Sequence, residues 1–289
     1  PLIMPSMYLH VDEEYNDFYH KKLLDLNKLD ALFTISNSAR NEIIKYVNFD
    51  SNRVFNISAA SDSKIFYQEC KGNEDISIDL TNYGKYILCS SAADPRKNLY
   101  RLLQAYSLLP PHLIYKHPLI LTGPLSVTEI QLINHWLNEL NLNPQNVHIL
   151  GYVSDYDLAN LYRNSYLFIF PSLHEGFGLP VLEAINCGAT VLASNLTSIP
   201  EIVGFKDALF DPYSVPDICS LMTRALTDNN FRNVIQKNTS DNKSKFSWDI
   251  TADKIIKYII QILNLDSFDS NRLTSISGLK LINEENYNL

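Results

Sequence analysis

The sequence predicts an α/β fold built on a doubly wound parallel sheet. Several short segments are almost continuously apolar, as parallel strands buried on both faces are. Longer segments with an amphipathic helical pattern lie between them, and this alternation of strand and helix is typical of parallel sheets. We expect strands at residues 31–36, 53–58, 85–90, 117–123, 146–151, 166–172 and 189–194.

The intervening helices are predicted from apolar residues that recur three or four positions apart. Such a stripe marks residues 98–109 and again residues 126–141. A third helix is expected over 179–188, with Pro180 in its first turn and Gly188 at its end. Residues 249–265 form a terminal amphipathic pattern, which predicts one further helix.

The chain divides into two predicted α/β units and a tail. Only two strands are expected in residues 1–67, too few for an independent unit, so we interpret this part as the remnant of a larger N-terminal domain. Residues 68–84 are polar and read as a linker. Residues 85–248 should form a complete second domain, 249–265 a crossover helix, and 266–289 a polar tail or a linker to another domain.

Composition narrows the class of protein. The chain is 46% hydrophobic and 19% charged, as soluble globular proteins are, and its net charge of −8 argues against a broad nucleic-acid surface. Four scattered cysteines predict neither a disulfide framework nor a zinc site. No apolar run approaches the length that spans a bilayer, and no signal peptide is visible. The scattered cysteines favour reduced thiols, so we expect a cytoplasmic protein.

The segment FPSLHEGFGLPVLEAINCGATV, residues 170–191, carries the strongest functional signal. It places a glycine-bearing turn between a strand and a helix, where open α/β sheets bind ligands and where a helix start attracts anions. Gly176 and Gly178 would let a ligand approach the backbone. Glu183, expected in the first helical turn, and Glu175 could accept hydrogen bonds from sugar hydroxyls. The pattern indicates a diphosphate with a sugar at each end.

Positive charge for that diphosphate is expected from the segment SSAADPRKNLYRLL, residues 90–103. Arg96 and Lys97 would stand at the start of the next helix, after a strand. A guanidinium and an ammonium there could clamp phosphates and offset the charge of a leaving group. Alternatively, this loop is a solvated turn, Glu175 is a solvated loop residue, and Glu183 only complements the helix dipole.

Three nearby features have structural interpretations. The motif SDYD, residues 154–157, contains the DxD pattern of metal-dependent transferases, but we interpret it as a capping box in which Ser154 is the N-cap and Asp157 the N3 carboxylate. His174 is interpreted as a loop histidine. Cys187 is expected to be a small core residue.

These residues resemble a known family. HEGFGLPVLEA is similar to the E-x7-E motif of the retaining, GT-B-fold glycosyltransferases of family 4. DPRKNLYRLLQAYSLLP resembles that family's phosphate loop, and the series LILTGP, VHILGYVSDYDLANLY, ALFDPYS and FSWDITADKI follows its C-terminal domain in order. The resemblance covers roughly residues 1–264. The sequence departs from the family's pattern at Ser90 and Ser91, and the family's glycine-rich loop and active-site histidine have no counterpart here.

The resemblance implies a role for each candidate residue. Arg96 and Lys97 would hold the donor diphosphate, and Glu175 would contact the transferred hexose, so these three are the catalytic candidates. Glu183 would bind the ribose hydroxyls. The remaining donor-binding candidates are Gly176, Phe177, Gly178, Leu179, Ser91, Tyr152 and Val153.

The implied function is that of a retaining hexosyltransferase of polysaccharide synthesis. It would use a nucleotide diphosphate sugar, GDP-mannose or a UDP-sugar, and no metal or other cofactor. The acceptor would be a saccharide or a lipid-linked molecule, which is compatible with peripheral association at the inner membrane face. The alternative is a non-catalytic nucleotide-sugar-binding module or a degenerate partner of a larger glycosyltransferase. A glycosidase that uses Glu175 and Glu183 as its carboxylate pair is disfavoured by the helix-start geometry and the adjacent phosphate clamp.

Overall fold

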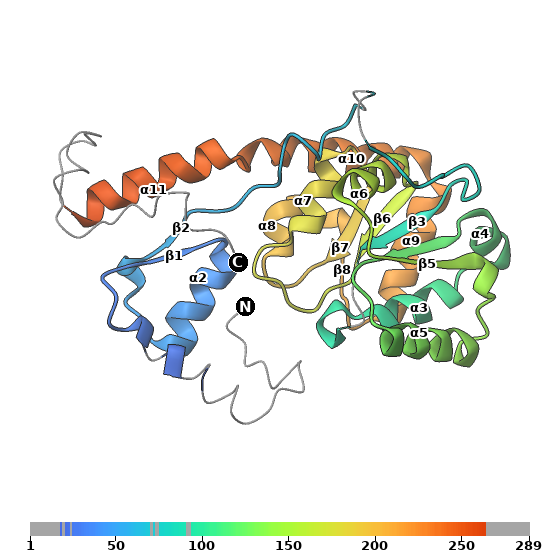
Figure 1. Cartoon of the computed structure of the whole chain (residues 1–289), viewed down its shortest axis with the longest axis horizontal. Coiled ribbons are helices and arrows are strands. Elements are labelled where there is room, and N and C mark those ends of the chain that lie inside the picture. Colours follow the sequence, from blue (N-terminus) through green and yellow to red (C-terminus); the bar gives the residue numbers. More distant parts are fainter. Residues whose placement is uncertain are drawn as a thin grey trace.

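The computed structural model describes residues 18, 21–23, 25–69, 72, 75–90 and 94–263. These residues form two α/β units that lie side by side, with a long C-terminal helix reaching from the second unit back along the first (Figure 1). The expectations for residues 1–17, for Ser91 and for the tail 266–289 fall outside the described residues.

The first unit is small. Its described part contains a parallel pair of strands, β1 (Leu32–Thr34) and β2 (Val54–Asn56), as expected. Between them, helix α2 (Asn37–Glu42) continues into a π-helical turn, η2 (Ile43–Val47). The side chain of Ser36 caps α2, because it accepts a hydrogen bond from the N–H of Ala39 at 3.0 Å.

The second unit contains, among the described residues, a six-stranded parallel sheet in the order β5-β4-β3-β6-β7-β8. Five of these strands were expected, and the two-residue β8 was not. The strands are β3 (Ile87–Ser90), β4 (Leu119–Thr122), β5 (Val147–Gly151), β6 (Leu167–Phe170), β7 (Val191–Ser194) and β8 (Leu209–Phe210).

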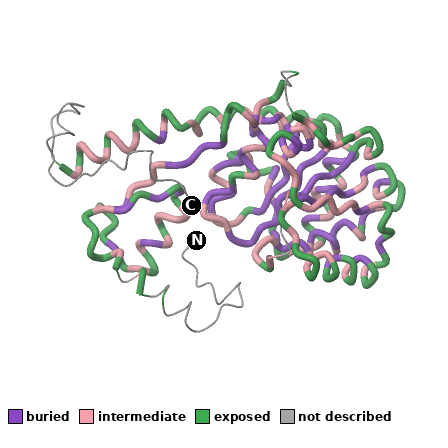
Figure 2. The backbone as a smooth tube through the Cα atoms, viewed as in Figure 1, coloured by how far each residue is buried: buried purple, intermediate pink, exposed green. Residues whose placement is uncertain are grey.

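Helices cover both faces of this sheet, and the strand interiors are buried (Figure 2). Every residue of β4, β6 and β7 is buried, which explains why their sequences are almost continuously apolar. The helices are α3 (Leu99–Ser107), α4 (Pro111–Lys116), α5 (Val127–Glu139), α6 (Asp155–Asn164), α7 (Leu179–Asn186), α8 (Ile199–Val203), α9 (Val215–Thr227) and α10 (Asn229–Asn242).

The strand order reverses between β3 and β6. From β3 the chain proceeds outward to β4 and β5, and from β6 it proceeds the other way to β7 and β8. The crossovers that follow β3 and β6 therefore pass to opposite faces of the sheet, and they start side by side at the carboxyl ends of these neighbouring strands. Doubly wound sheets bind their ligands at such a switch point.

The described residues of the linker contain no helix or strand, yet they are held to the second unit. Asp157 accepts hydrogen bonds from the N–H groups of Ser77 and Ile78, at 2.7 and 3.0 Å. Ser154 is the N-cap of α6, as expected, and accepts from the N–H of Asp157. The second half of the expected capping box is wrong. The Asp157 carboxylate accepts hydrogen bonds from the linker and from the Ser154 hydroxyl, instead of from the backbone N–H of Ser154.

The C-terminal helix α11 (Trp248–Ile262) returns to the first unit, as the expected crossover helix would. Its Tyr258 ring stacks on Phe55 of β2, with the ring centroids 4.5 Å apart. None of the helices within the described ranges is both long and apolar enough to cross a membrane.

Candidate functional site

The loops after β3 and β6 meet at the switch point. The carbonyl oxygen of Arg96 accepts hydrogen bonds from the N–H of Leu173, at 2.7 Å, and from the hydroxyl of Ser172, at 3.1 Å. These bonds join the Arg96–Lys97 segment directly to the strand end that precedes Glu175. The two segments singled out from the sequence are thus one site.

Lys97 and Glu175 form the charged centre of this site. The Lys97 ammonium lies 2.6 Å from Glu175 Oε1, and the Ser172 hydroxyl donates to the same oxygen at 2.8 Å. Both side chains are mostly buried, with 22% and 15% of their surfaces exposed. Lys97 also lies 5.4 Å from the centroid of the Phe170 ring. Partial burial strengthens this pair relative to a surface salt bridge.

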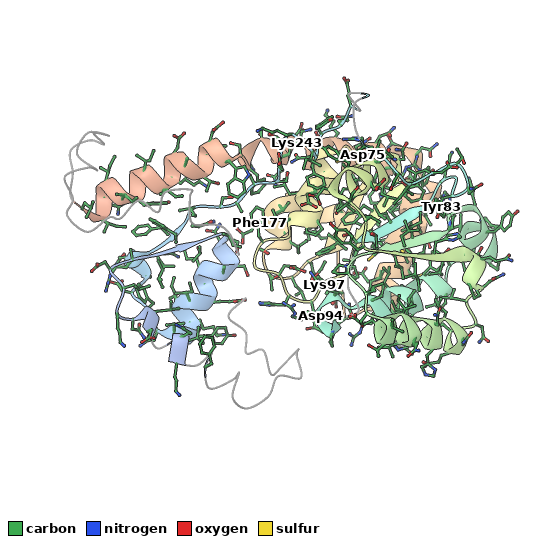
Figure 3. All side chains as sticks on the ribbon, in the orientation of Figure 1. Asp75, Tyr83, Asp94, Lys97, Phe177 and Lys243 are labelled. Atoms are coloured by element: carbon green, nitrogen blue, oxygen red, sulfur yellow. The ribbon has the colours of Figure 1, made fainter. Side chains whose placement is uncertain are left out.

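Arg96 differs from its expected placement. Arg96 and Lys97 belong to a separate 3₁₀ turn, η4 (Pro95–Lys97), and not to the first turn of α3. Asn98, whose φ is 57°, separates the two, and its amide donates to the carbonyls of Pro171 and Pro212. The Arg96 guanidinium is paired with Asp94, at 2.6 Å. Figure 3 shows Asp94 and Lys97 together on the side of the second unit that faces the first.

The turn between β6 and α7 combines a tightly packed glycine with backbone N–H groups that have no acceptor in the described part of the chain. Gly178 has φ 111°, and a Cβ atom there would lie 2.6 Å from Cδ1 of Ile199. The sequence offered ligand access as the reason for this glycine, whereas the structure shows close packing against α8. Among the described residues, none accepts a hydrogen bond from the N–H groups of Gly176, Phe177 or Gly178. These donors remain available to an anion.

Glu183 lies in the second turn of α7, which corrects the expected first-turn position. Its side chain still reaches the space over the preceding turn, because side chains in a helix tilt toward the N-terminus. Burial raises the pKa of Glu183 from 4.5 to about 7, with a smaller opposing effect from the Tyr162 hydroxyl, which lies 3.4 Å from Oε2. Near neutral pH this carboxyl is therefore partly protonated.

The other donor-binding candidates are spread around these groups. Tyr152 is 78% exposed and Val153 half-buried, both directly after β5. The Phe177 side chain is buried and packs against Phe246, with the ring centroids 5.7 Å apart. Leu179 is exposed at the start of α7.

His174 lies in the loop between β6 and α7, as expected, but the loop buries it. It is 2% exposed, and its Nε2 atom lies 3.1 Å from a carboxylate oxygen of Glu42 in α2. Cys187 is buried, which confirms the core interpretation. No group of three or more histidine, cysteine, aspartate or glutamate side chains that could hold a metal ion occurs in the described part of the chain.

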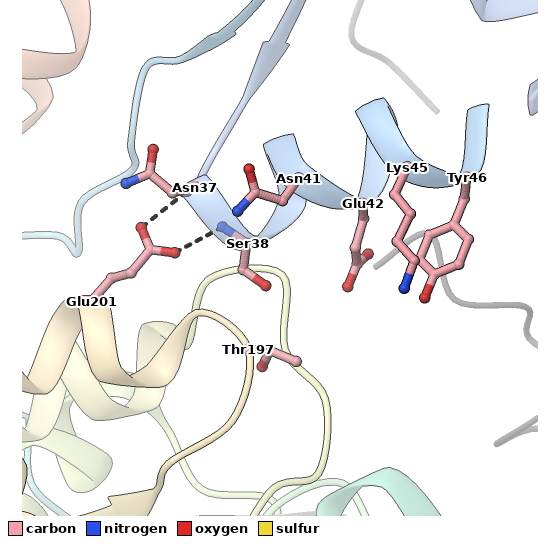
Figure 4. A pocket seen from close by; sticks show the side chains of 8 residues that line it. All are labelled: Asn37, Ser38, Asn41, Glu42, Lys45, Tyr46, Thr197 and Glu201. Carbon is pink, nitrogen blue, oxygen red and sulfur yellow. Dashed lines mark hydrogen bonds between the residues drawn. The ribbon is translucent and has the colours of Figure 1, made fainter. Parts of the chain in front are cut away.

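Sequence reasoning missed a pocket between the two units, which lies beside the Glu175 turn (Figure 4). Its volume is about 380 Å³. Glu201 of α8 reaches across to α2 and accepts hydrogen bonds from the N–H groups of Asn37 and Ser38, at 2.9 and 2.8 Å. The pocket is lined by Asn37, Ser38, Asn41, Glu42, Lys45, Tyr46, Thr197 and Glu201. No periodic signal could reveal it, since its walls lie about 160 positions apart in the chain.

Fold and site together define a class. Doubly wound sheets bind ligands at the switch point, where Lys97 and Glu175 lie, and a helix start beside it favours an anionic group such as a phosphate. Residues 74–242 match the family model described as glycosyl transferases group 1. The chain belongs to this family, and its fold is of the GT-B type, as expected.

Two curated relatives are mannosyltransferases. The chain is 36% identical over 284 residues to the serotype-specific mannosyltransferase WbdA of Escherichia coli, an alignment that covers 97% of this chain and 35% of WbdA. It is 36% identical over 231 residues to the O-antigen chain mannosyltransferase B of the same species, covering 78% of this chain and 58% of that protein. The chain thus spans about a third of the length of WbdA.

A solved structure supports the fold. HepE from Anabaena, in complex with UDP and glucose, superposes with a TM-score of 0.73 at 18% sequence identity. The superposition covers 86% of this chain and 68% of HepE.

Proposed function

We propose that this chain is the donor-binding part of a glycosyltransferase that moves a hexose from a nucleotide diphosphate sugar to an acceptor in polysaccharide synthesis. The observation that carries the proposal is the Lys97–Glu175 pair at the switch point, in a chain that belongs to the group 1 glycosyl transferases. Both relatives described above are mannosyltransferases, which favours GDP-mannose over a UDP-sugar as the donor. We further propose that the reaction retains the anomeric configuration.

In this proposal Lys97 changes partner when the donor binds. Its ammonium would turn from Glu175 toward the diphosphate, where negative charge grows as the glycosidic bond breaks. Glu175 would then accept hydrogen bonds from hexose hydroxyls. Arg96, held by Asp94, would add positive charge beside the phosphates, while the N–H groups of Gly176 to Gly178 would donate to the donor's oxygens.

Glu183 would bind the ribose. A ribose has two adjacent hydroxyls that can donate to one carboxylate, and donors favour the ionised carboxylate over the protonated acid. Since the pKa of Glu183 is about 7, ribose binding near neutral pH should release a proton. Tyr152, exposed after β5, would lie beside the base.

We place the acceptor in the pocket between the units. Its amide, carboxylate and hydroxyl side chains suit the hydroxyls of a saccharide, and the half-exposed ring of Tyr46 offers an apolar face. Thr197 lines this pocket and also accepts a hydrogen bond from the N–H of Glu175, so the pocket adjoins the proposed hexose position. A lipid-linked saccharide would bring the chain to the inner face of a membrane.

Calorimetric titration of the chain with GDP, UDP and ADP tests the proposal. Glu183→Ala and Lys97→Ala should each abolish binding of the one nucleotide that the unaltered chain selects. Lys116→Ala, which removes an exposed lysine from the last turn of α4, is the matched control and should leave binding unchanged. Absence of binding to all three nucleotides would contradict the proposal.

A second candidate function is a nucleotide-sugar-binding module without transfer activity. It is favoured by one observation: both cationic groups of the site already have carboxylate partners, Lys97 in Glu175 and Arg96 in Asp94. Hydrolysis or transfer of GDP-mannose by the chain, measured as released GDP, separates the two. Nucleotide binding without any release of GDP would favour the module.

A further inference from the structure

Hydroxyl groups hold three successive carbonyls of the turn that contains Glu175. The Ser198 hydroxyl donates to the carbonyls of Glu175 and Phe177, at 3.0 and 2.7 Å. The Ser36 hydroxyl donates to the carbonyl between them, that of Gly176, at 2.6 Å. Thr197 completes the set by accepting from the N–H of Glu175 at 3.1 Å. We call Ser36, Thr197 and Ser198 the hydroxyl clamp.

Ser36 is the member of the clamp that comes from the other unit, 140 positions away in the chain. It is 2% exposed, so its hydroxyl has little access to water as an alternative partner. Two sets of hydrogen bonds fix its position. The Ser36 hydroxyl caps α2, and the N–H groups of the next two residues, Asn37 and Ser38, donate to the Glu201 carboxylate. The first unit therefore contacts the Glu175 turn through a rigid group.

The backbone of Thr197 is strained, which indicates that forming the hydroxyl clamp costs free energy of folding. Its φ is 52°, in the left-handed region that β-branched residues rarely adopt. Such strain persists only where the surroundings over-determine the backbone, and it concentrates at functional sites. Here the strained residue directly precedes Ser198 and holds the N–H of Glu175.

We infer that Ser36 is a positioning residue for the donor hexose. Through the carbonyl of Gly176 it fixes the turn in the conformation that presents Glu175 and the neighbouring N–H groups to the sugar. Recognition of the hexose thus depends on the first unit, whereas recognition of the nucleotide, through Glu183 and Lys97 in the second unit, does not. This inference rests on the proposed function.

The test compares the affinities of GDP-mannose and GDP, with UDP-glucose and UDP in parallel, by calorimetry. The unaltered chain should bind the nucleotide sugar more tightly than the nucleotide. Ser36→Ala should weaken nucleotide-sugar binding about tenfold, the value of one hydrogen bond, and leave nucleotide binding within about twofold. Ser36→Thr keeps the hydroxyl and should restore the difference.

Ser126→Ala is the matched control, because Ser126 caps α5 in the same way but lies on an exposed helix start. It should change neither affinity. If Ser36→Ala does not fold, Ser198→Ala removes two clamp bonds without touching the cap of α2 and should show the same selective loss.

Equal weakening of both ligands by Ser36→Ala, or no weakening of either, would overturn the inference and leave the proposed function standing. So would equal affinities of the unaltered chain for nucleotide and nucleotide sugar. If the unaltered chain binds none of the four ligands, the proposed function fails, and the inference fails with it.

Discussion

At the scale of single residues, Glu183 shows how a binding site can cost stability. Its carboxyl is largely buried, and among the described residues the hydroxyl of Tyr162, 3.4 Å away, is a long and weak donor to it. Burial therefore raises its pKa to about 7, against 4.5 for the exposed group. The folded chain keeps a proton on Glu183 between these two values, where the unfolded chain has lost it.

This difference sets the sign of a pH effect. Between pH 4.5 and 7 the folded state binds the extra proton, so the free energy of unfolding falls as the pH rises through this window. The loss should amount to about 3 kcal/mol. Glu183→Gln cannot ionise, and its stability relative to the unaltered chain should therefore increase from pH 5 to pH 8.

Urea unfolding of both proteins at pH 5, 6, 7 and 8 measures the effect. All other titrating groups are shared, so the difference between the two curves isolates Glu183. A constant difference across the series would show that the carboxyl has an ordinary pKa and is not buried as the structure has it.

At the scale of elements, the β6–α7 turn combines a packing constraint with the proposed ligand site. Gly178 has φ 111°, and a Cβ atom there would strike Cδ1 of Ile199, a side chain that is itself fully buried. Gly178→Ala should lower the free energy of unfolding by about 2–4 kcal/mol, through backbone strain and overpacking together.

Gly84→Ala is the control for this substitution. Gly84 also has a positive φ, 57°, but a Cβ atom there meets no other atom within 4 Å. Only the strain contribution, about 1–2 kcal/mol, should remain. Equal losses in the two variants, measured by urea unfolding, would mean that the contact with Ile199 is unimportant.

The sequence predicted the elements better than the contacts between them. Buried parallel strands leave apolar runs, so β3 to β7 could be placed, and β8 was missed because two residues make no pattern. The Lys97–Glu175 meeting was foreseeable, since both follow strand ends. The contacts of Ser36 and Glu201 were not, because single hydrogen bonds between distant segments leave no periodic signal.

At the scale of the whole molecule, the two units are joined by more than the linker. The hydroxyl of Ser36 and the carboxylate of Glu201 connect them beside the site. On the other side, α11 lays Tyr258 against Phe55 and, at 6.5 Å, Phe33 of the small parallel sheet. Since that sheet has two strands in the described residues, its stability should depend heavily on this aromatic contact.

Tyr258→Ala should therefore loosen the first unit selectively. Loss of the stacked ring removes apolar burial and an aromatic pair, which together are worth about 2–3 kcal/mol. Amide hydrogen exchange should become faster in β1, β2 and α2, while the amides of β3, β6 and β7 keep their protection, because the core of the second unit does not use Tyr258.

Tyr115→Ala is the matched control for this experiment, since Tyr115 is 84% exposed on α4 and its loss should change no protection factor. A uniform increase of exchange in both units of Tyr258→Ala would mean that the molecule opens as a single cooperative body. In that case α11 stabilises both units equally, and the contact of Tyr258 with Phe55 and Phe33 belongs to one cooperative core.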